Sequence, residues 1–409
     1  MAPLSGVRAC LLAGIMLAAP SRGAAPEGIA PLRAPGKAEG RIHSYQDDAN
    51  LYVTTVAGLL EHPISSLFSL RIRTVADWIT ILAKQPSGDP DPHAGHSGHE
   101  HNEADDNPII ADAISGASAR IGSGTGTPRE MRAAGALGAV FTGAYRSRPV
   151  TVSAEFRGSR EPDYLSLGGV LAGQISLFRG NSTVSAFAGA GRDEIDPAEP
   201  PPGQIGRWPA RQLKFSGGVS LARILTPRLI VSAGASAASQ TGRLSSPYRN
   251  SLVGITYFPE NLPGSRLRAT SFLQGSLYLG QGTALHIRQG LYADGWGVTA
   301  WIPETALARE LGGGLLATVK HRFYAQTAAD FYRPVYAGRK GNHTGDARLG
   351  RLYDQTGALE AEYRIPAATG RAGPLILSAE YSFSHLEYPD LHPRVLVSHV
   401  FSIGVRSDY

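Results

Sequence analysis

The sequence predicts an all-β protein, an antiparallel transmembrane β-barrel of about 14–16 strands that carries a signal peptide and a long His-rich loop. Three observations support this fold. The chain opens on a secretion signal, segments of about ten residues with alternating apolar and polar side chains follow one another, and no later apolar run is as long as the about 18 residues that a membrane helix needs. The 49 glycines, 28 prolines and 18% charged residues also favour strands and turns over helical bundles.

Residues 1–23 are predicted to be a signal peptide. Arg8 precedes the apolar run "ACLLAGIMLAAP", and the small residues Ser21 and Gly23 suit signal peptidase. The only cysteine, Cys10, lies in this segment, so the mature chain would lack disulfides, thiol catalysis and cysteine-bound metal. Residues 24–50 are predicted to be a periplasmic lead-in, and residues 51–409 the outer-membrane barrel.

The alternation is clearest in "VTVSAEFR". Val150, Val152, Ala154 and Phe156 share one face, whereas Thr151, Ser153, Glu155 and Arg157 share the other. A period of two residues is the pattern of a strand with two different faces. Fourteen segments are predicted as strands on this basis: 65–76, 132–145, 149–158, 163–177, 182–192, 211–224, 229–240, 265–279, 283–292, 296–306, 313–325, 352–364, 374–384 and 395–406.

The number of strands depends on one further segment. "LYVTTVAGLL", which begins at Leu51, also alternates and would make the count odd. Bacterial single-chain barrels have even strand numbers, so a second additional strand is then needed, for which "NSLVGITYF" at 250–258 is a candidate. The sequence therefore predicts fourteen or sixteen strands.

The connections and the chain end indicate a membrane barrel. Short links such as "YRSRPV" and "ILTPRL" alternate with long ones at 193–209, 242–264, 327–351 and 386–394, as periplasmic turns and extracellular loops do. In "VFSIGVRSDY" the residues Phe401, Ile403, Val405 and Tyr409 would lie on one face of a strand. This pattern resembles the C-terminal strand that the barrel-assembly machinery accepts. We therefore expect the bacterial cell outer membrane as location, with outer-membrane lipid, lipopolysaccharide and that machinery as partners.

Several phrases resemble one known family. They occur in a characteristic order: "YQDDANLYV", "DAISGASAR", "SREPDYLSL", "LSSPYRN", "PENLPGSRLRA", "YADGWGV" and "HRFYAQTAADFY". This set is similar to the bacterial family of predicted outer-membrane proteins known as domain of unknown function 3570. The resemblance covers most of the mature chain. It implies an outer-membrane barrel and assigns no activity to particular residues.

A candidate metal site lies in the predicted inserted loop 79–130. Its stretch 91–106, "DPHAGHSGHEHNEADD", brings together the candidate ligands His93, His96, His99, His101, Glu100 and Asp105. Imidazole and carboxylate groups suit zinc, copper or nickel, although no cofactor is required by the fold. The alternative is a solvated loop without a metal role, because glycine, proline and acids surround the histidines. Counting strands back from "ILTPRL" places this loop outside the cell.

A second candidate site is the lumen. The basic residues predicted to line it are Arg157, Lys214, Arg266, Arg268, Arg288, Lys320 and Arg322. A basic lumen would concentrate anions. Alternatively, the same residues pair with inward glutamates, since buried charges need partners.

The predicted function is a channel or transporter for small solutes or ions. One alternative is a non-conducting surface barrel that binds metal through the His-rich loop, and another is a secreted soluble β protein. An enzyme is not predicted, because Ser384 and His385 are adjacent on a strand and would point to opposite faces. Nucleic acid is not an expected partner, since the net charge is only +5 and no basic-aromatic run occurs.

Overall fold

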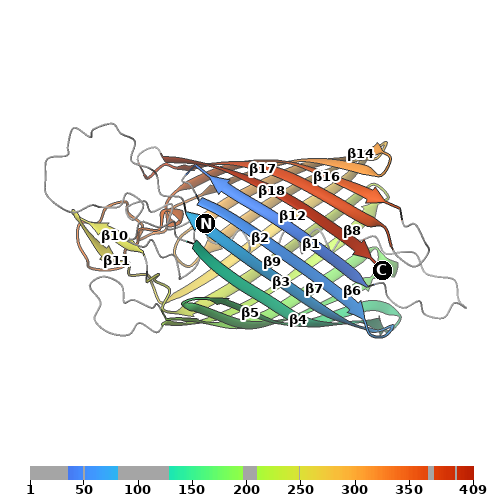
Figure 1. The fold of residues 1–409 in the computed structure, drawn as a ribbon, viewed down its shortest axis with the longest axis horizontal. Coiled ribbons are helices and arrows are strands. Elements are labelled where there is room, and N and C mark those ends of the chain that lie inside the picture. The colour runs from blue at the N-terminus through green and yellow to red at the C-terminus, as the bar shows by residue number, and fades with distance from the viewer. Residues whose placement is uncertain are drawn as a thin grey trace, which may run out of the picture.

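The computed structural model describes residues 36–48, 51–81, 129–196, 210–247, 249–366, 373–391 and 394–409. Sixteen of its strands form one closed antiparallel barrel, drawn with its axis horizontal in Figure 1. This confirms the predicted all-β barrel and the higher of the two predicted strand numbers. Neighbours in the barrel are neighbours in sequence, except that β9 pairs with β12 across the small hairpin β10–β11 and that β1 pairs with β18 to close the barrel. No helix of the described residues is long and apolar enough to cross a membrane.

The strands share a length that suits a tilted crossing of a bilayer. The sixteen barrel strands are β1 (Lys37–Asp47), β2 (Leu51–Pro63), β3 (Phe68–Ile81), β4 (Arg129–Tyr145), β5 (Arg148–Glu161), β6 (Tyr164–Leu177), β7 (Ser182–Ile195), β8 (Ala210–Thr226), β9 (Leu229–Gly242), β12 (Ser265–Gly280), β13 (Thr283–Asp294), β14 (Thr299–Gly312), β15 (Leu315–Gln326), β16 (Leu352–Ile365), β17 (Leu375–Tyr388) and β18 (Arg394–Asp408). The hairpin outside the barrel consists of β10 (Asn250–Val253) and β11 (Thr256–Pro259), and two short 3₁₀ turns are η1 (Phe178–Gly180) and η2 (Ala347–Leu349).

The barrel closes between its first and last strands. Lys37 lies opposite Asp408 and Asp47 opposite Ser398, so β1 is paired with β18 along its whole length. The predicted lead-in 24–50 is therefore wrong for residues 37–47, which belong to the barrel. The prediction missed β1 because its outward positions between residues 38 and 46 carry small or polar side chains, with Ile42 as the single large apolar one.

The second additional strand is thus β1, and not the candidate at 250–258. That segment folds back on itself, with Asn250 opposite Pro259 and Val253 opposite Thr256. Gly254 adopts a φ of 63°, a conformation that favours glycine, at the turn between its two halves. In Figure 1 this hairpin lies beyond the end of the barrel.

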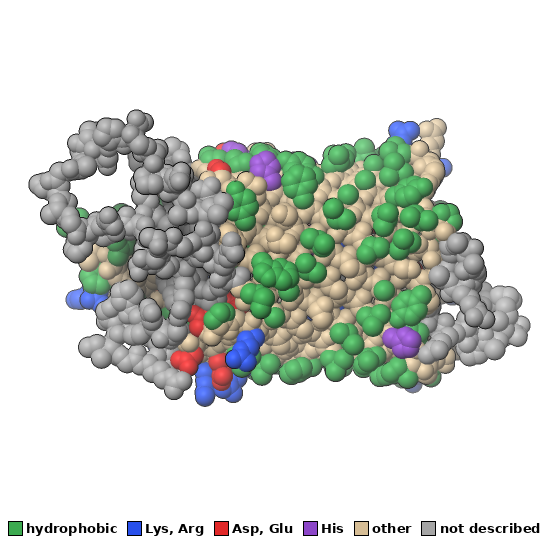
Figure 2. All heavy atoms as spheres, in the orientation of Figure 1, with side chains coloured by type: hydrophobic (Ala, Val, Ile, Leu, Met, Phe, Trp, Pro, Cys, Tyr) green, Lys and Arg blue, Asp and Glu red, His purple; other side chains and the backbone are tan. Residues whose placement is uncertain are grey.

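The outward face of the barrel is apolar. Outward side chains such as Phe156, Leu359 and Ile403 are 61%, 57% and 69% exposed. Figure 2 shows hydrophobic and uncharged surface over the middle of the wall, with charged side chains toward its ends. An exposed apolar wall of this extent is expected where the surrounding medium is hydrocarbon.

The two ends of the barrel differ in their connections. At one end the strands are joined by short links, such as Arg146–Ser147 between β4 and β5, and the chain terminates there at Tyr409. The other end, here the long-loop end, carries the segments 243–264 and 327–351 and the connection from Ile81 to Arg129. The His-rich stretch 91–106 belongs to that last connection. It lies outside the described residues, as does the predicted signal peptide 1–23.

Candidate functional site

The basic residues predicted to line the lumen occupy the inward positions of their strands. Residues opposite one another in neighbouring strands share a face, and Gln240 lies opposite both Lys214 and Arg266. In the same way Arg322 lies opposite Glu304. The register continues this assignment to the other predicted residues, Arg157, Arg268, Arg288 and Lys320.

Five of these seven residues have a carboxylate partner. The pairs are Arg157 with Glu155 (2.5 Å), Lys214 with Asp193, Arg266 with Asp294 (2.9 Å from Nε), Lys320 with Glu360 (2.7 Å) and Glu380 (2.9 Å), and Arg322 with Glu304 (3.7 Å) and Asp354 (3.1 Å). The inner wall therefore carries charges of both signs rather than a purely basic lining.

These pairs run along the wall of the barrel. Lys320 on β15 reaches Glu360 on β16 and Glu380 on β17, which is two strands away. Arg73 on β3 likewise reaches Glu155 on β5, at 3.1 Å. Each pair named here joins residues of one strand or of strands at most two apart, so none of them bridges the lumen. Pairing of this kind satisfies the buried charges without requiring that opposite walls meet.

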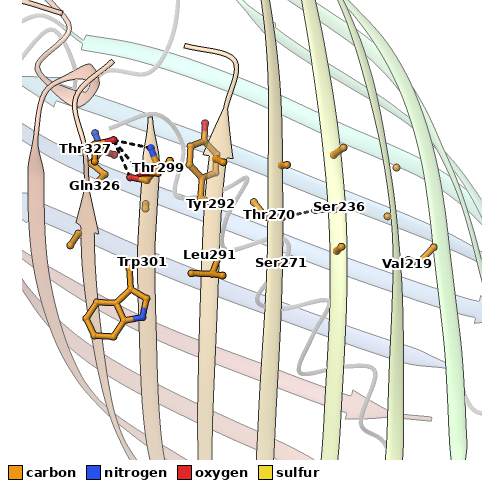
Figure 3. A pocket seen from close by; sticks show the side chains of 18 of the residues that line it. Val219, Ser236, Thr270, Ser271, Leu291, Tyr292, Thr299, Trp301, Gln326 and Thr327 are labelled. Atoms are coloured by element: carbon orange, nitrogen blue, oxygen red, sulfur yellow. Dashed lines mark hydrogen bonds between the residues drawn. The ribbon is translucent and has the colours of Figure 1, made fainter. Parts of the chain in front are cut away.

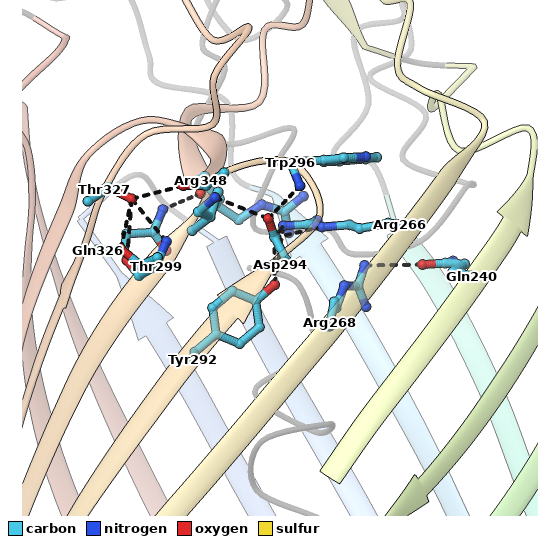
Figure 4. Close-up of polar contacts among 12 residues, drawn as sticks. Gln240, Arg266, Arg268, Tyr292, Asp294, Trp296, Thr299, Gln326, Thr327 and Arg348 are labelled. Carbon is cyan, nitrogen blue, oxygen red and sulfur yellow. Dashed lines mark hydrogen bonds and ion pairs between the residues drawn. The ribbon is translucent and has the colours of Figure 1, made fainter. Parts of the chain in front are cut away.

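Arg268 and Arg288 differ from the other five, because no ion pair joins them to a described carboxylate. The Nη2 atom of Arg268 donates to the neutral Oε1 atom of Gln240 at 3.1 Å, and the positive charges of Arg266 and Arg348 and the negative charge of Asp294 all act on it. The guanidinium of Arg288 lies over the ring of Phe272, 4.1 Å from its centroid. Figure 4 shows Arg268 beside Gln240 at the long-loop end. This end thus holds an arginine whose charge a solute can still compensate.

Asp294 organises the wall next to Arg268. Its carboxylate is fully buried and accepts hydrogen bonds from Arg266, from the Tyr292 hydroxyl (2.7 Å) and from the backbone N–H groups of Trp296 (2.9 Å) and Val298 (3.1 Å). The indole of Trp296 donates to the Ser265 carbonyl at 2.8 Å and lies under the Arg266 guanidinium. Strands β12 and β13 and the turn into β14 are therefore joined at one residue (Figure 4).

The segments 243–264 and 327–351 pack against each other at the long-loop end and form what we call the loop cap. Short bridges pair Val253 with Tyr336 and Asn261 with His343. Inside, the Ser251 hydroxyl lies 2.6 Å from Nδ1 of His343. An apolar cluster that includes Trp296, Val298, Ala329, Tyr332 and Leu349 attaches the cap to the barrel.

A buried carboxylate lies within the loop cap. Glu260 accepts from the Thr344 hydroxyl at 2.6 Å and from the backbone N–H of Ser246 at 2.5 Å, with the Arg249 guanidinium 3.9 Å away. Burial raises the pKa of Glu260 to about 7, although Arg249 and the hydrogen bonds oppose this shift. The cap therefore contains a group that titrates near neutral pH.

The wall also has an apolar hollow of about 1140 Å³ that extends across β7 to β16. Most of its lining residues point outward and are small, with Val219, Leu291 and Trp301 among the larger ones (Figure 3). Its ionisable side chains are the phenols Tyr292 and Tyr353. This composition suits contact with lipid chains better than chemistry on a substrate.

The structure separates Ser384 from His385. The Ser384 hydroxyl points inward to Asp354, at 2.5 Å, whereas His385 is half-exposed near Glu387. The candidate metal ligands His93, His96, His99, His101, Glu100 and Asp105 lie outside the described residues. Within the described part of the chain, no three His, Cys, Asp or Glu side chains are grouped to hold a metal ion.

Sequence reasoning missed Asp294, Gln240 and the loop cap as parts of a site. A signal was present, because the phrases that carry the family resemblance meet here. "PENLPGSRLRA" contains Glu260, Arg266 and Arg268, and "YADGWGV" contains Asp294. "LSSPYRN" and "HRFYAQTAADFY" supply other residues of the cap and the adjoining wall. Segments that are far apart in sequence thus converge at the long-loop end.

Residues 129–373 match the family model described as "Protein of unknown function (DUF3570)". The chain belongs to this family. No curated protein matches it. This membership confirms the resemblance seen in the sequence. The loop cap and strands β12 to β16 lie within the matched region.

Solved structures similar to this DUF3570 member are distant. A bacterial polysaccharide outer membrane secretin has 9% identity and a TM-score of 0.47, over 91% of this chain and 98% of its own. The ferric enterobactin receptor PfeA from Pseudomonas aeruginosa has 12% identity and a TM-score of 0.43, over 90% of this chain and 54% of its own. OccAB3 from Acinetobacter baumannii has 9% identity and a TM-score of 0.35, over 92% and 99%. Similarity at this level assigns no substrate to the chain.

Proposed function

We propose that this protein is a bacterial outer-membrane barrel that lets small hydrophilic solutes or ions pass through its lumen. The observation that carries the proposal is a closed barrel of sixteen strands whose named inner charge pairs run along the wall. Barrels of about 16–18 strands are wide enough to hold a water-filled channel. Side chains that pair within the wall leave the axis to water and solute.

The proposed orientation places the long-loop end outside the cell. Short periplasmic turns and long extracellular loops are the rule for such barrels, and β18 ends at the short-turn end, where Figure 1 marks the C-terminus. Outer-membrane fractionation and heat-modifiable gel migration test the location. A chain that appears in the soluble fraction and migrates identically before and after boiling would be a secreted soluble β protein instead.

Arg268 is the residue we propose to contact anionic solutes. It has a neutral partner in Gln240 and lies beside two further arginines at the entrance to the lumen. A positive charge at a narrow entrance raises the local concentration of anions. The passage is therefore proposed to prefer anions over cations.

Planar-bilayer recordings of the purified protein test this function. We expect conductance, and a reversal potential in a salt gradient that indicates anion preference. Arg268→Gln should lower that preference, whereas Arg309→Gln, which changes an outward residue of β14, should leave it unchanged. Absence of conductance in bilayers together with absence of solute flux in liposomes would refute passage.

A second proposed function is capture of a transition metal at the cell surface. It is favoured by the position of the connection between Ile81 and Arg129, which leaves and re-enters the barrel at the long-loop end. The candidate ligands in it are His93, His96, His99 and His101, with Glu100 and Asp105. Calorimetric titration with Zn²⁺, Cu²⁺ or Ni²⁺ should show binding that the fourfold His→Ala variant loses. Equal binding by both proteins would remove this function.

A further inference from the structure

At the short-turn end of the barrel, the turns and strand ends from β4 to β9 carry a group of arginines, which we call the arginine rim. It comprises Arg146 and Arg148 at the β4–β5 turn, Arg179 at the β6–β7 turn, Arg223 near the end of β8 and Arg228 at the β8–β9 turn. All five side chains are exposed, and no ion pair joins any of them to a described carboxylate. The rim is therefore a patch of uncompensated positive charge.

Exposed aromatic and apolar side chains accompany these arginines. Tyr145 and Phe178 are 58% and 72% exposed, and the Arg146 guanidinium lies 5.3 Å from the centroid of the Tyr145 ring. Leu225 in the neighbouring turn is 52% exposed. Aromatic residues beside basic ones at the edge of an apolar band are typical of the membrane–water interface. A soluble acidic partner would not account for the exposed Phe178 and Leu225.

Several residues in these turns adopt a backbone conformation that ordinary side chains disfavour. Arg146, Ser147, Phe178 and Arg179 have φ values of 49°, 63°, 51° and 58°. This left-handed conformation favours glycine or asparagine, and an ordinary side chain there is disfavoured by about 1 kcal/mol or more. Turns elsewhere on the same end use glycine at such positions, at Gly280, Gly282 and Gly312 to Gly314, with Gln281 (φ 49°) as another non-glycine residue. Two of the five arginines, Arg146 and Arg179, thus occupy positions where local stability favours other residues.

We propose that the arginine rim binds the phosphate headgroups of anionic phospholipids in the leaflet that surrounds the short-turn end. This rests on the proposed membrane location, and not on conduction. Guanidinium groups form charge-assisted, often bidentate hydrogen bonds with phosphate oxygens. Basic side chains at a membrane surface add attraction to anionic lipid that salt weakens.

The test compares two lipids in vesicles that contain the full-length protein. Spin-labelled phosphatidylglycerol and spin-labelled phosphatidylcholine are the probes, and the ratio of their association with the barrel wall is measured. The variant changes the rim arginines together: Arg146→Gln, Arg148→Gln, Arg179→Gln, Arg223→Gln and Arg228→Gln. Its matched control changes outward arginines at the opposite end, as Arg160→Gln, Arg192→Gln and Arg211→Gln.

The wild type should prefer phosphatidylglycerol, and the rim variant should lose about fivefold or more of that preference while the control keeps it. A ratio of one in the wild type, an unchanged ratio in the rim variant, or an equal loss in both variants would overturn the proposal. If the rim variant fails to fold, Arg146→Asn and Arg179→Asn serve instead, because asparagine suits the left-handed turn while the charge is lost. If the protein conducts nothing but still prefers phosphatidylglycerol, the passage function is refuted and the lipid-binding proposal stands. If the protein does not insert into vesicles, both proposals are overturned.

Discussion

Replacement of Asp294 by alanine tests the idea that one buried carboxylate holds the long-loop end together. The substitution removes the counterion of Arg266 and the acceptor of three further hydrogen bonds, from Tyr292 and from the backbone N–H groups of Trp296 and Val298. The Arg266 side chain is only 13% exposed, so water replaces the lost contact poorly. We therefore expect a large loss of stability from a single change.

The magnitude follows from these contacts. Removal of one partner of a buried ion pair destabilises a protein by about 3–5 kcal/mol. The contact of Arg266 with the Trp296 ring, 4.2 Å from the centroid, is the same in wild type and variant and does not enter the difference. The loss expected for Asp294→Ala is thus about 3–5 kcal/mol. Asp294→Asn keeps an oxygen for the two backbone donors and loses the charge and the acceptor for Arg266 and Tyr292, so it should destabilise less than alanine.

Urea titration of unfolding in lipid vesicles measures this loss. The midpoint should fall in the order wild type, Asp294→Asn, Asp294→Ala, with an unchanged dependence on urea concentration. Asp390→Ala is the matched control, because it removes an ion pair with the exposed Arg351 at the same end and should change stability far less. If Asp294→Ala unfolds at the midpoint of the wild type, the carboxylate does not organise this end.

Three further outcomes are expected. Because burial raises the pKa of Glu260 from its ordinary value of 4.5 to about 7, the folded cap binds the proton more tightly than the opened one, and its stability should fall as pH rises across that window. Hydrogen exchange of residues 243–264, corrected for intrinsic rates, should show less protection at pH 8 than at pH 5, and Glu260→Gln should remove the difference; greater protection at pH 8 would contradict this. Gly345→Ala should open the cap to limited proteolysis, since a Cβ there would lie 2.0 Å from the Asn250 carbonyl oxygen; an uncleaved variant would show that the cap tolerates the shift. Lys320→Gln leaves two lumen glutamates without their shared cation and should shift bilayer reversal potentials toward cation preference, whereas an unchanged potential would place those glutamates outside the conduction path.

The sequence was sufficient to predict the barrel because all outward positions face the same apolar medium. Every membrane-facing position favours an apolar or small residue, so alternation repeats in most strands and is visible without knowledge of their partners. Strand β1 shows where this signal fails. With small and polar residues at nearly all of its outward positions, nothing in its own sequence separates it from a lead-in. Its pairing with β18 and β2 identifies it as a strand.

The candidate site depended on information that alternation does not contain. Alternation in the sequence predicts that Arg266 and Arg268 face the lumen, but it does not predict which of them has a carboxylate partner. The register sets Asp294 opposite Arg268 and Gln240 opposite Arg266, yet the hydrogen bonds run diagonally, from Arg266 to Asp294 and from Arg268 to Gln240. The direction of each long side chain therefore decides the partner, and a single sequence does not specify that direction.

The distribution of charge along the lumen indicates where selectivity would arise. Along the wall, cations such as Lys320 pair with carboxylates on strands one or two positions away, so the positive charge is offset within the wall. At the long-loop end Arg268 has no ion pair with a described carboxylate, whereas the neighbouring Arg266 and Arg348 pair with Asp294 and Asp346. A passing anion would therefore meet one such cation at the entrance, Arg268, and a second, Arg288, further along the wall. Under the proposed function, substitutions at the entrance should change which ions enter, while neutral exchanges of whole pairs deeper in the wall, such as Arg71→Gln with Glu61→Gln, should alter stability more than selectivity.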